Sequence, residues 1–303
     1  MKFLIRTQLL LILIFVSIIH CQNTIIPGGP VSGTWDLAGS PYLVQGDIEI
    51  PDDSTLVIEP GVVVEFQGHY ELNIQGMLLA IGTESDTIHF TVNDTTGFHN
   101  PDTNLGGWEG IKIIDPDTTN DSTKIIYCKL EYGKAVGPVW SLNAGGALTI
   151  LNFDKVRIEN CLFNKNSAGG DTTDIPTGGA IHLAWSDVKL SGNTFSNNRA
   201  VSGGAIKCHD SDPVFSNNIF INNYALEGGG IITDGLSNPA FYGDKFFNNT
   251  AVNRGGGIIC YDSSATFNNV TVSGNFGNWG GGIGVYNSNV KIYNSTISDN
   301  GSI

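Results

Sequence analysis

Six copies of a Gly-Gly-Ala/Gly-aliphatic step constrain the fold of this chain more than any other feature. The steps begin at Gly145, Gly178, Gly203, Gly228, Gly255 and Gly280, at spacings of 33, 25, 25, 27 and 25 residues. A fixed period of this length is typical of a stacked solenoid. Because each repeat of a solenoid supplies one coil of a scaffold, function is to be sought on its outer surface.

Residues after each Gly step alternate with the period of a β-strand. The third position after the first glycine holds Leu148, Ile181, Ile206, Ile231, Ile258 and Ile283, and the fifth holds Ile150, Leu183, Cys208, Thr233, Cys260 and Val285. The intervening position holds Thr149, His182, Lys207, Ile232, Ile259 and Gly284. The pattern predicts that the third and fifth positions face inward. Two further short strands per coil, without a helix-period segment, predict an all-β, right-handed parallel β-helix.

A second step ends each coil with an apolar residue followed by Asn. It reads Phe163/Asn166, Phe195/Asn198, Phe220/Asn223, Phe247/Asn249, Val272/Asn275 and Ile297/Asn300. We expect structural roles for these residues. Gly178, Gly203, Gly228, Gly255 and Gly280 permit positive φ and close approach of coils. Asn198, Asn223, Asn249 and Asn275 either bond the equivalent Asn of the next coil or adopt a left-handed conformation.

The ends of the chain predict an exported protein. Residues 1–22 form a predicted signal peptide, because Lys2 and Arg6 precede the apolar stretch from Leu9 to Ile19. Residues 23–40 are predicted to cap the solenoid, which spans 41–303 with irregular coils at 41–144 and regular coils at 145–303. No capping segment follows Ser295–Asn300, so we expect a truncated C-terminal end and further C-terminal domains.

Charge excludes some partners. The net charge is −14, and removal of Lys2 and Arg6 changes it to −16. Such a surface repels nucleic acid and anionic lipid. The register also argues against disulfides, because Cys208 and Cys260 lie two coils apart, roughly 10 Å. Cys128 and Cys161 occur in similar contexts, and we expect all four cysteines to be free, buried thiols.

The repeats resemble known families. The "GGAI"/"GGGI" and "F-x-x-N" steps are similar to repeats of chlamydial polymorphic outer membrane proteins and of the pectate-lyase-like superfamily. The stretch "SPYLVQGDIEIPDDSTLVIEPGVVVEFQG" followed by "GGWEGIKI" is similar to large secreted β-helix proteins of Bacteroidetes-type bacteria. This resemblance covers roughly residues 35–300. It implies the fold, export and surface association with an outer membrane, but the superfamily includes lyases, polygalacturonases and adhesins.

Candidate site residues lie at the sixth and seventh positions after the Gly step. Asp210, Asp234 and Asp262 are predicted to stack on three successive coils, where carboxylates roughly 5 Å apart suit glycoside hydrolysis or a Ca²⁺ site. Trp185, His209, Tyr261 and Tyr286 are candidate carbohydrate contacts. The alternative is that these residues are solvated turns. The catalytic motifs of polygalacturonases and pectate lyases do not occur in the sequence.

Two weaker patterns complete the candidates. The acidic loop with Asp115, Asp117 and Asp121 is a candidate Ca²⁺ site, although such loops are more often solvated. Arg254 is in register with Glu227 and Trp279, which predicts an ion pair with stacking on the indole.

The sequence therefore predicts a secreted or cell-surface scaffold for adhesion or polysaccharide binding without catalysis. No cofactor is required, Ca²⁺ is a candidate ligand, and the expected partner is a polysaccharide or a host or cell-surface ligand. Two alternatives remain: a polysaccharide lyase or glycoside hydrolase acting on acidic polysaccharide, and an autotransporter passenger segment.

Overall fold

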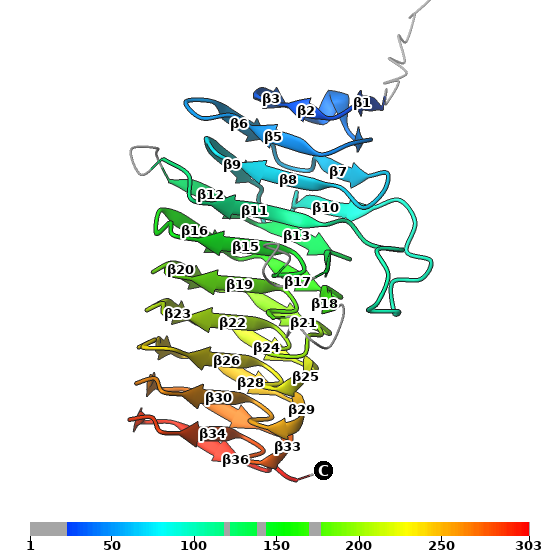
Figure 1. The fold of residues 1–303 in the computed structure, drawn as a ribbon. Helices are drawn as coiled ribbons and strands as arrows, with labels where there is room; N and C mark the ends of the chain where they lie inside the picture. The colour runs from blue at the N-terminus through cyan, green and yellow to red at the C-terminus, as the bar shows by residue number, and fades with distance from the viewer. Residues whose placement is uncertain (1–22, 118–121, 138–143, 170–176, 303) are drawn as a thin grey trace, which may run out of the picture.

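The computed structural model describes residues 23–117, 122–137, 144–169 and 177–302. The predicted signal peptide and Asp121 lie outside these residues. The described chain winds into a stack of coils that runs from β1 (Thr24–Ile26) at one end to β36 (Thr296–Ser298) at the other (Figure 1). Its sheets are parallel throughout, so the predicted right-handed parallel β-helix is confirmed.

Three parallel sheets run the length of the stack, with successive coils as neighbours. Sheet A has eleven strands: β1, β4 (Tyr42–Val44), β7 (Val63–Phe66), β10 (Ile88–Val92), β13 (Cys128–Glu131), β17 (Leu162–Asn164), β21 (Thr194–Ser196), β24 (Ile219–Ile221), β28 (Lys245–Phe247), β32 (Thr271–Ser273) and β36. Sheet B has ten: β2 (Gly29–Pro30), β5 (Ile48–Ile50), β8 (Glu71–Ile74), β11 (Gly110–Ile114), β15 (Leu148–Leu151), β19 (Ile181–Ala184), β22 (Ile206–His209), β26 (Ile231–Asp234), β30 (Ile258–Tyr261) and β34 (Ile283–Tyr286).

Sheet C also has ten strands: β3 (Gly33–Trp35), β6 (Thr55–Ile58), β9 (Met77–Ile81), β12 (Thr123–Ile126), β16 (Val156–Glu159), β20 (Lys189–Ser191), β23 (Val214–Ser216), β27 (Ala240–Tyr242), β31 (Thr266–Asn268) and β35 (Lys291–Tyr293). Two small sheets flank them: β14 (Lys134–Val136) with β18 (Ser167–Gly169), and β25 (Tyr224–Glu227), β29 (Thr250–Arg254) and β33 (Phe276–Trp279). In the described chain, the only helical element is the 3-10 turn η1 (Leu37–Gly39).

The segment 23–40 is itself a coil. Its strands β1, β2 and β3 pair in parallel with β4, β5 and β6, in the same three sheets as every later coil. The segment 23–40 therefore forms the first described coil of the stack. The sequence did not indicate this because β1, β2 and β3 are only two or three residues long and mostly exposed.

The predicted inward positions form the core. From Leu148 to Cys260 the third and fifth positions of each coil are buried. Aromatic rings stack from coil to coil, with centroids of Phe195 and Phe220 4.8 Å apart and those of Phe220 and Phe246 4.6 Å apart. The inward residue before Asn249 is thus Phe246, and the prediction of Phe247 is wrong by one residue. Phe246 precedes its Asn by three positions, as Phe195 and Phe220 do, so the ladder keeps one register.

The corners of the coils behave as predicted for Gly and Asn. The first glycine of each step has positive φ, from 64° at Gly228 to 72° at Gly203. Asn166, Asn198, Asn223, Asn249, Asn275 and Asn300 form a continuous ladder. From Asn198 onward, each Oδ1 accepts hydrogen bonds from the main-chain and side-chain nitrogens of the preceding Asn, and Oδ1 of Asn166 accepts one from the main chain of Gly133. The left-handed conformation belongs to the residue before the Asn, such as Asn197 or Asn222.

A second buried ladder occupies the corner between sheets C and A. Asn193, Asn218 and Asp244 follow one another on successive coils, and each side chain accepts hydrogen bonds from the residue before it. The main-chain nitrogen of Cys161 bonds the first of them, and Cys161 in turn lies against Cys128. All four described cysteines are free and buried, as predicted.

Candidate functional site

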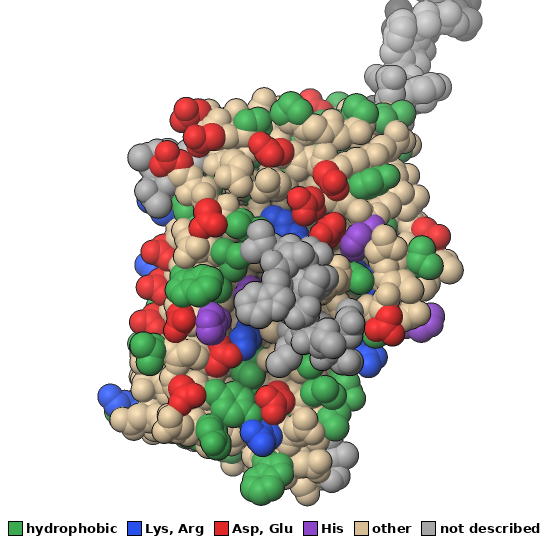
Figure 2. All heavy atoms as spheres, viewed as in Figure 1, with side chains coloured by type: hydrophobic (Ala, Val, Ile, Leu, Met, Phe, Trp, Pro, Cys, Tyr) green, Lys and Arg blue, Asp and Glu red, His purple; other side chains and the backbone are tan. Residues whose placement is uncertain are grey.

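The outer face of sheet B carries a cluster of charged side chains on adjacent strands. Because successive residues of a strand point to opposite faces, Lys207 and His209 of β22 share the outer face. The parallel register places Asp234 of β26 directly beside His209. Figure 2 shows acidic, basic, histidine and apolar side chains intermixed over the strands of this sheet.

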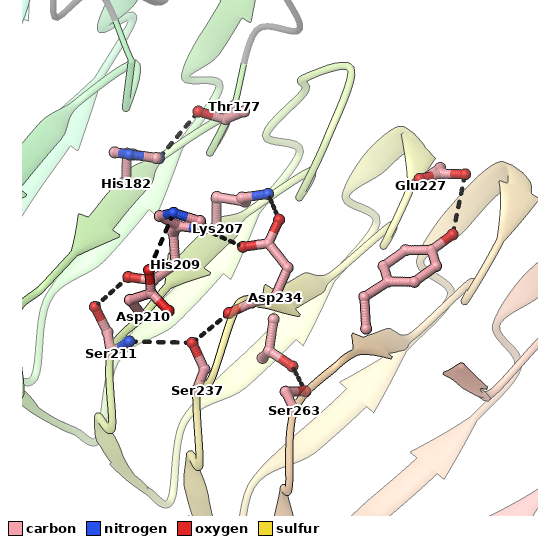
Figure 3. Close-up of polar contacts among 12 residues, drawn as sticks. Thr177, His182, Lys207, His209, Asp210, Ser211, Glu227, Asp234, Ser237 and Ser263 are labelled. Carbon is pink, nitrogen blue, oxygen red and sulfur yellow. Dashed lines mark hydrogen bonds and ion pairs between the residues drawn. The ribbon is translucent and has the colours of Figure 1, made fainter. Parts of the chain in front are cut away.

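Asp234 lies at the centre of the cluster. Its Oδ1 is 2.7 Å from Nδ1 of His209, and its Oδ2 contacts the ammonium of Lys207 (Figure 3). The second ring nitrogen of His209, Nε2, lies 3.3 Å from Oδ2 of Asp210. Oδ1 of Asp210 accepts a hydrogen bond from the main chain of Leu236, on the next coil. One histidine therefore bridges two carboxylates, one of which also holds a lysine.

These contacts set the charge states. The hydrogen bond to Asp234 raises the pKa of His209, with further help from the negative charges of Asp234 and Asp210. Burial raises the pKa of Asp234, but the hydrogen bond from His209 and the charge of Lys207 outweigh it, so the net pKa lies below the usual range. Both pKa shifts thus favour the ion pair between His209 and Asp234.

The Gly step explains why Lys207 is buried although it faces outward. Ile232 and Ile259 occupy the same outward column as Lys207 and are also buried. A Cβ on Gly228 would collide with Ile232, and one on Gly255 would collide with Ile259. The chain before each strand therefore folds back over the outer face and shields the column that contains Lys207. The column that contains His209 and Asp234, two residues further along each strand, stays half-exposed.

The three aspartates predicted as catalytic do not form one column. Asp234 pairs with His209, whereas Asp210 and Asp262 occupy the following position, with Gly235 between them. Asp210 and Asp262 both have φ of 44°, and they belong to a column of left-handed residues that ends each sheet-B strand. The prediction of a three-carboxylate stack is therefore wrong: strand alternation separates the two columns, and Asp210 and Asp262 lie two coils apart.

Aromatic side chains flank the ion pairs. Trp185 follows β19, is about half-exposed, and meets the ring of His209 edge-to-face at 5.5 Å. Tyr261 and Tyr286 are register partners on β30 and β34, with ring centroids 5.6 Å apart. The candidate carbohydrate contacts Trp185, His209, Tyr261 and Tyr286 thus lie on one face, at the ends of β19, β22, β30 and β34.

Arg254 and Glu227 form the predicted ion pair, with 4.0 Å between Nη1 and Oε1. The hydroxyl of Tyr261 links them, since it accepts a 2.9 Å hydrogen bond from Arg254 and donates to Glu227 at 3.2 Å. Trp279 is the register partner of Arg254 and is largely exposed. Trp279, Arg254 and Tyr286 border a hollow of about 310 Å³ whose floor includes Ile259 and Gly284.

Two of the three candidate Ca²⁺ residues, Asp115 and Asp117, lie within the described part of the chain. Asp115 is a left-handed corner residue whose Oδ1 accepts a 2.6 Å hydrogen bond from Asn152, and Asp117 is exposed. Within the residues that the structure describes, no group of three or more His, Cys, Asp or Glu side chains is arranged to hold a metal ion. None of the described helical residues forms a helix of sufficient length and apolarity to span a membrane.

Lys207 is the member of the cluster that was not among the predicted site residues. Its position two residues before His209 places both on the same strand face, so strand alternation alone would have identified it. Predicting the contact between Lys207 and Asp234 also requires the register between β22 and β26. Counting from Gly203 and Gly228 gives that register, because His209 and Asp234 are both six residues after their glycines.

Comparison with known proteins gives the family. Residues 89–278, more than half of the chain, match the family model described as the right-handed beta helix region. Protein bark beetle of Drosophila melanogaster is 35% identical over 79 residues, which are 26% of this chain and 2% of that protein. This chain thus corresponds to a very small part of that relative. The search of solved structures gave no significant match. The match over most of the regular coils, together with the three parallel sheets, means that the chain belongs to the right-handed β-helix family.

Proposed function

We propose that this protein is an exported scaffold that binds polysaccharide on the outer face of sheet B without cleaving it. The observation that supports this most is that exposed or partly exposed aromatic rings after β19 and on β30 and β34 flank the ion-paired residues of β22 and β26. Trp185, Tyr261 and Tyr286 offer flat apolar surfaces, and His209 and Asp210 offer polar groups beside them. Sugar rings bind to this combination, because one face of a pyranose is apolar and its hydroxyls need hydrogen-bond partners.

The repeat favours a polymer over a single sugar. Neighbouring coils place equivalent side chains roughly 4.8 Å apart. From Trp185 to Tyr286 the surface crosses five sheet-B strands, β19, β22, β26, β30 and β34. A chain of sugars lying along the solenoid axis would contact several coils at once, and weak contacts per coil would add up to a stable complex.

The charge states favour binding over turnover. A general base needs a free lone pair at neutral pH and a general acid needs a transferable proton. Both nitrogens of His209 face carboxylates, and Asp234 is held ionised by Lys207 and His209. The groups with acid–base chemistry are thus engaged with one another.

Export and a cell-surface or extracellular location are part of this proposal. They rest on the basic and apolar N-terminal residues and on the family resemblance of the repeats. The negative net charge supports an extracellular ligand other than nucleic acid. An acidic polysaccharide as substrate of a lyase or hydrolase is the alternative that the experiment below must exclude.

The test is a carbohydrate array probed with the wild-type protein and with two surface variants. Trp185→Ala and Tyr286→Ala should each weaken binding of the retained polysaccharide by about tenfold. Tyr242→Ala is the matched control, since Tyr242 is similarly exposed but lies on β27 of sheet C. Equal losses in all three variants would contradict a binding face on sheet B. Release of reducing ends or unsaturated products, abolished by Asp234→Ala, would instead establish an enzyme.

A further inference from the structure

Both ring nitrogens of His209 face carboxylate oxygens, at 2.7 Å from Asp234 and 3.3 Å from Asp210. A neutral imidazole has one N–H donor and one lone pair, so one of these two contacts would be repulsive. The imidazolium has two donors and satisfies both carboxylates. The geometry therefore corresponds to the protonated ring.

The groups around His209 favour a proton on its ring. Lys207, on the same strand, is already paired with the other oxygen of Asp234. His182, on the neighbouring strand β19, bonds Thr177, and burial lowers its pKa to about 3, so it stays neutral. Asp210 and Asp234 are carboxylates that both favour the proton on His209. The ring is partly exposed, so its proton exchanges with solvent.

His209 also fixes the aromatic surface. Its ring meets the indole of Trp185 edge-to-face, 5.5 Å between centroids, and Trp185 has no regular strand of its own because it lies at the left-handed corner after β19. The polar N–H edge of the cationic ring is anchored on two coils, by Asp210 of its own coil and Asp234 of the next. The ring that contacts Trp185 is thus held through both of its nitrogens.

We propose that His209 is a proton-operated positioning residue: as the imidazolium it holds Asp210, Asp234 and Trp185 in one arrangement, and loss of its proton loosens that arrangement. This rests on the proposed function in so far as it makes polysaccharide binding weaken at alkaline pH. The backbone does not follow, because Asp210 still accepts a hydrogen bond from Leu236 after the proton is lost. The neutral ring keeps its shorter contact, with Asp234, and releases Asp210.

The test follows one residue by two independent signals. The Cε1–H resonances of the six histidines are recorded from about pH 5 to about pH 9, with His209→Gln to assign the signal. The contribution of Trp185 to the fluorescence is obtained by difference from Trp185→Phe over the same range. His99→Gln is the control, because His99 is exposed and lies far along the chain, in the segment between β10 and β11. Retention on the polysaccharide selected by the array is measured at both ends of the range.

We expect His209 to titrate above about 6.5, the ordinary value for histidine. The emission of Trp185 should change with the same midpoint, and retention should fall about tenfold as the proton is lost. In His209→Gln both should be independent of pH, whereas His99→Gln should behave as the wild type. A titration at or below the ordinary value, or an emission of Trp185 that ignores the titration, would overturn the proposal. If no polysaccharide is retained at any pH, the proposed function fails, and the two spectroscopic signals still decide the role of His209.

Discussion

The side-chain amide of Asn218 donates a 2.8 Å hydrogen bond to the carboxylate of Asp244, one coil further along the stack. The main-chain nitrogen of Asn218 donates to the same oxygen. In the preceding rungs, Asn193 and Asn218 also use their Nδ2 to bond a carbonyl of the coil before, that of Ile158 or Leu190. Ionised Asp244 has no hydrogen-bond donor, so it cannot make the equivalent bond to a carbonyl of the preceding coil. Burial raises the pKa of Asp244 to about 6, so the ladder ends in an acid that is costly to ionise.

Asp244→Asn should stabilise the protein at neutral pH. The pKa of Asp244 rises from 3.8 to about 6 on folding, so the folded state binds the proton more tightly. The proton on Asp244 therefore contributes stability that is fully present below about pH 4, and about 3 kcal/mol of it is lost as the pH rises through 6. Urea unfolding at about pH 4, 6 and 8 should show that the variant escapes this loss at the highest pH, less the hydrogen bond that the main-chain nitrogen of Tyr242 donates to Oδ2 of Asp244. Asp212→Asn, at an exposed corner, is the control and should change little. A variant less stable than the wild type at pH 8 would contradict the assignment.

Asn223→Ala should remove one rung of the continuous Asn ladder. Asn223 is buried, and its loss leaves the main-chain and side-chain nitrogens of Asn198 without their acceptor and removes a donor from the carbonyl of Phe195. We expect a loss of about 3–5 kcal/mol in the free energy of unfolding, measured by denaturant titration. The neighbouring Asn222 is exposed with φ of 57°, so Asn222→Gly should be nearly neutral. Similar losses in the two variants would mean that the ladder bonds contribute little.

Gly204→Ala should separate the coils. A Cβ on Gly204 would run into the carbonyl oxygen of Gly229 on the next coil and of Tyr224, both main-chain atoms. We expect a loss of about 3 kcal/mol or more, seen as a lower thermal midpoint. Gly243→Asn is the matched comparison, because its nearest neighbour would be a side chain, that of Asn217, and Asn occupies this corner at residues 217 and 269. It should lose no more than about 1 kcal/mol. A larger loss of stability in Gly243→Asn than in Gly204→Ala would show that the second glycine of the step is not needed for the close approach of the coils.

Lys134→Met should release the loop between β10 and β11. The buried ammonium of Lys134 donates to the carbonyls of Asn100 at 2.7 Å, Leu105 at 2.8 Å and Gly97 at 3.3 Å. Without it these carbonyls lose a cationic donor, and local opening should accelerate protease cleavage within 97–105 by about tenfold or more. Lys245→Met, at an exposed position of β28, should leave cleavage unchanged. Cleavage at the wild-type rate in Lys134→Met would show that other contacts hold the loop.

The regular coils were predictable because one alignment on the Gly step fixes every later position. It gave the inward columns, the free thiols and the Asn ladder. The inward residue before Asn249 was predicted as Phe247 and not Phe246, because either of two adjacent phenylalanines satisfies the pattern of an apolar residue followed by Asn. The second ladder was missed because Asn193, Asn218 and Asp244 look like ordinary turn residues, although their spacing matches the repeat.

The site was harder to predict than the fold. The alignment already placed His209 and Asp234 at one position and Asp210 and Asp262 at the next, yet residue type suggested a single acidic column. The ion pair with Lys207 depends on how far a flexible side chain reaches across a coil, which periodicity does not encode. Nor does the sequence reveal that the Gly step folds back over one outward column and leaves the other exposed.

The central claim, that the ligand lies on the outer face of sheet B, is tested most directly by hydroxyl-radical footprinting with and without the bound polysaccharide. The account predicts that the ligand slows oxidation of Trp185, Tyr261 and Tyr286. Tyr242 and Tyr293 of sheet C and Tyr224 of β25 are exposed tyrosines on other faces and should be oxidised at unchanged rates. Protection of those three with none at Trp185 and Tyr286 would contradict the account and move the binding surface away from the His209 cluster.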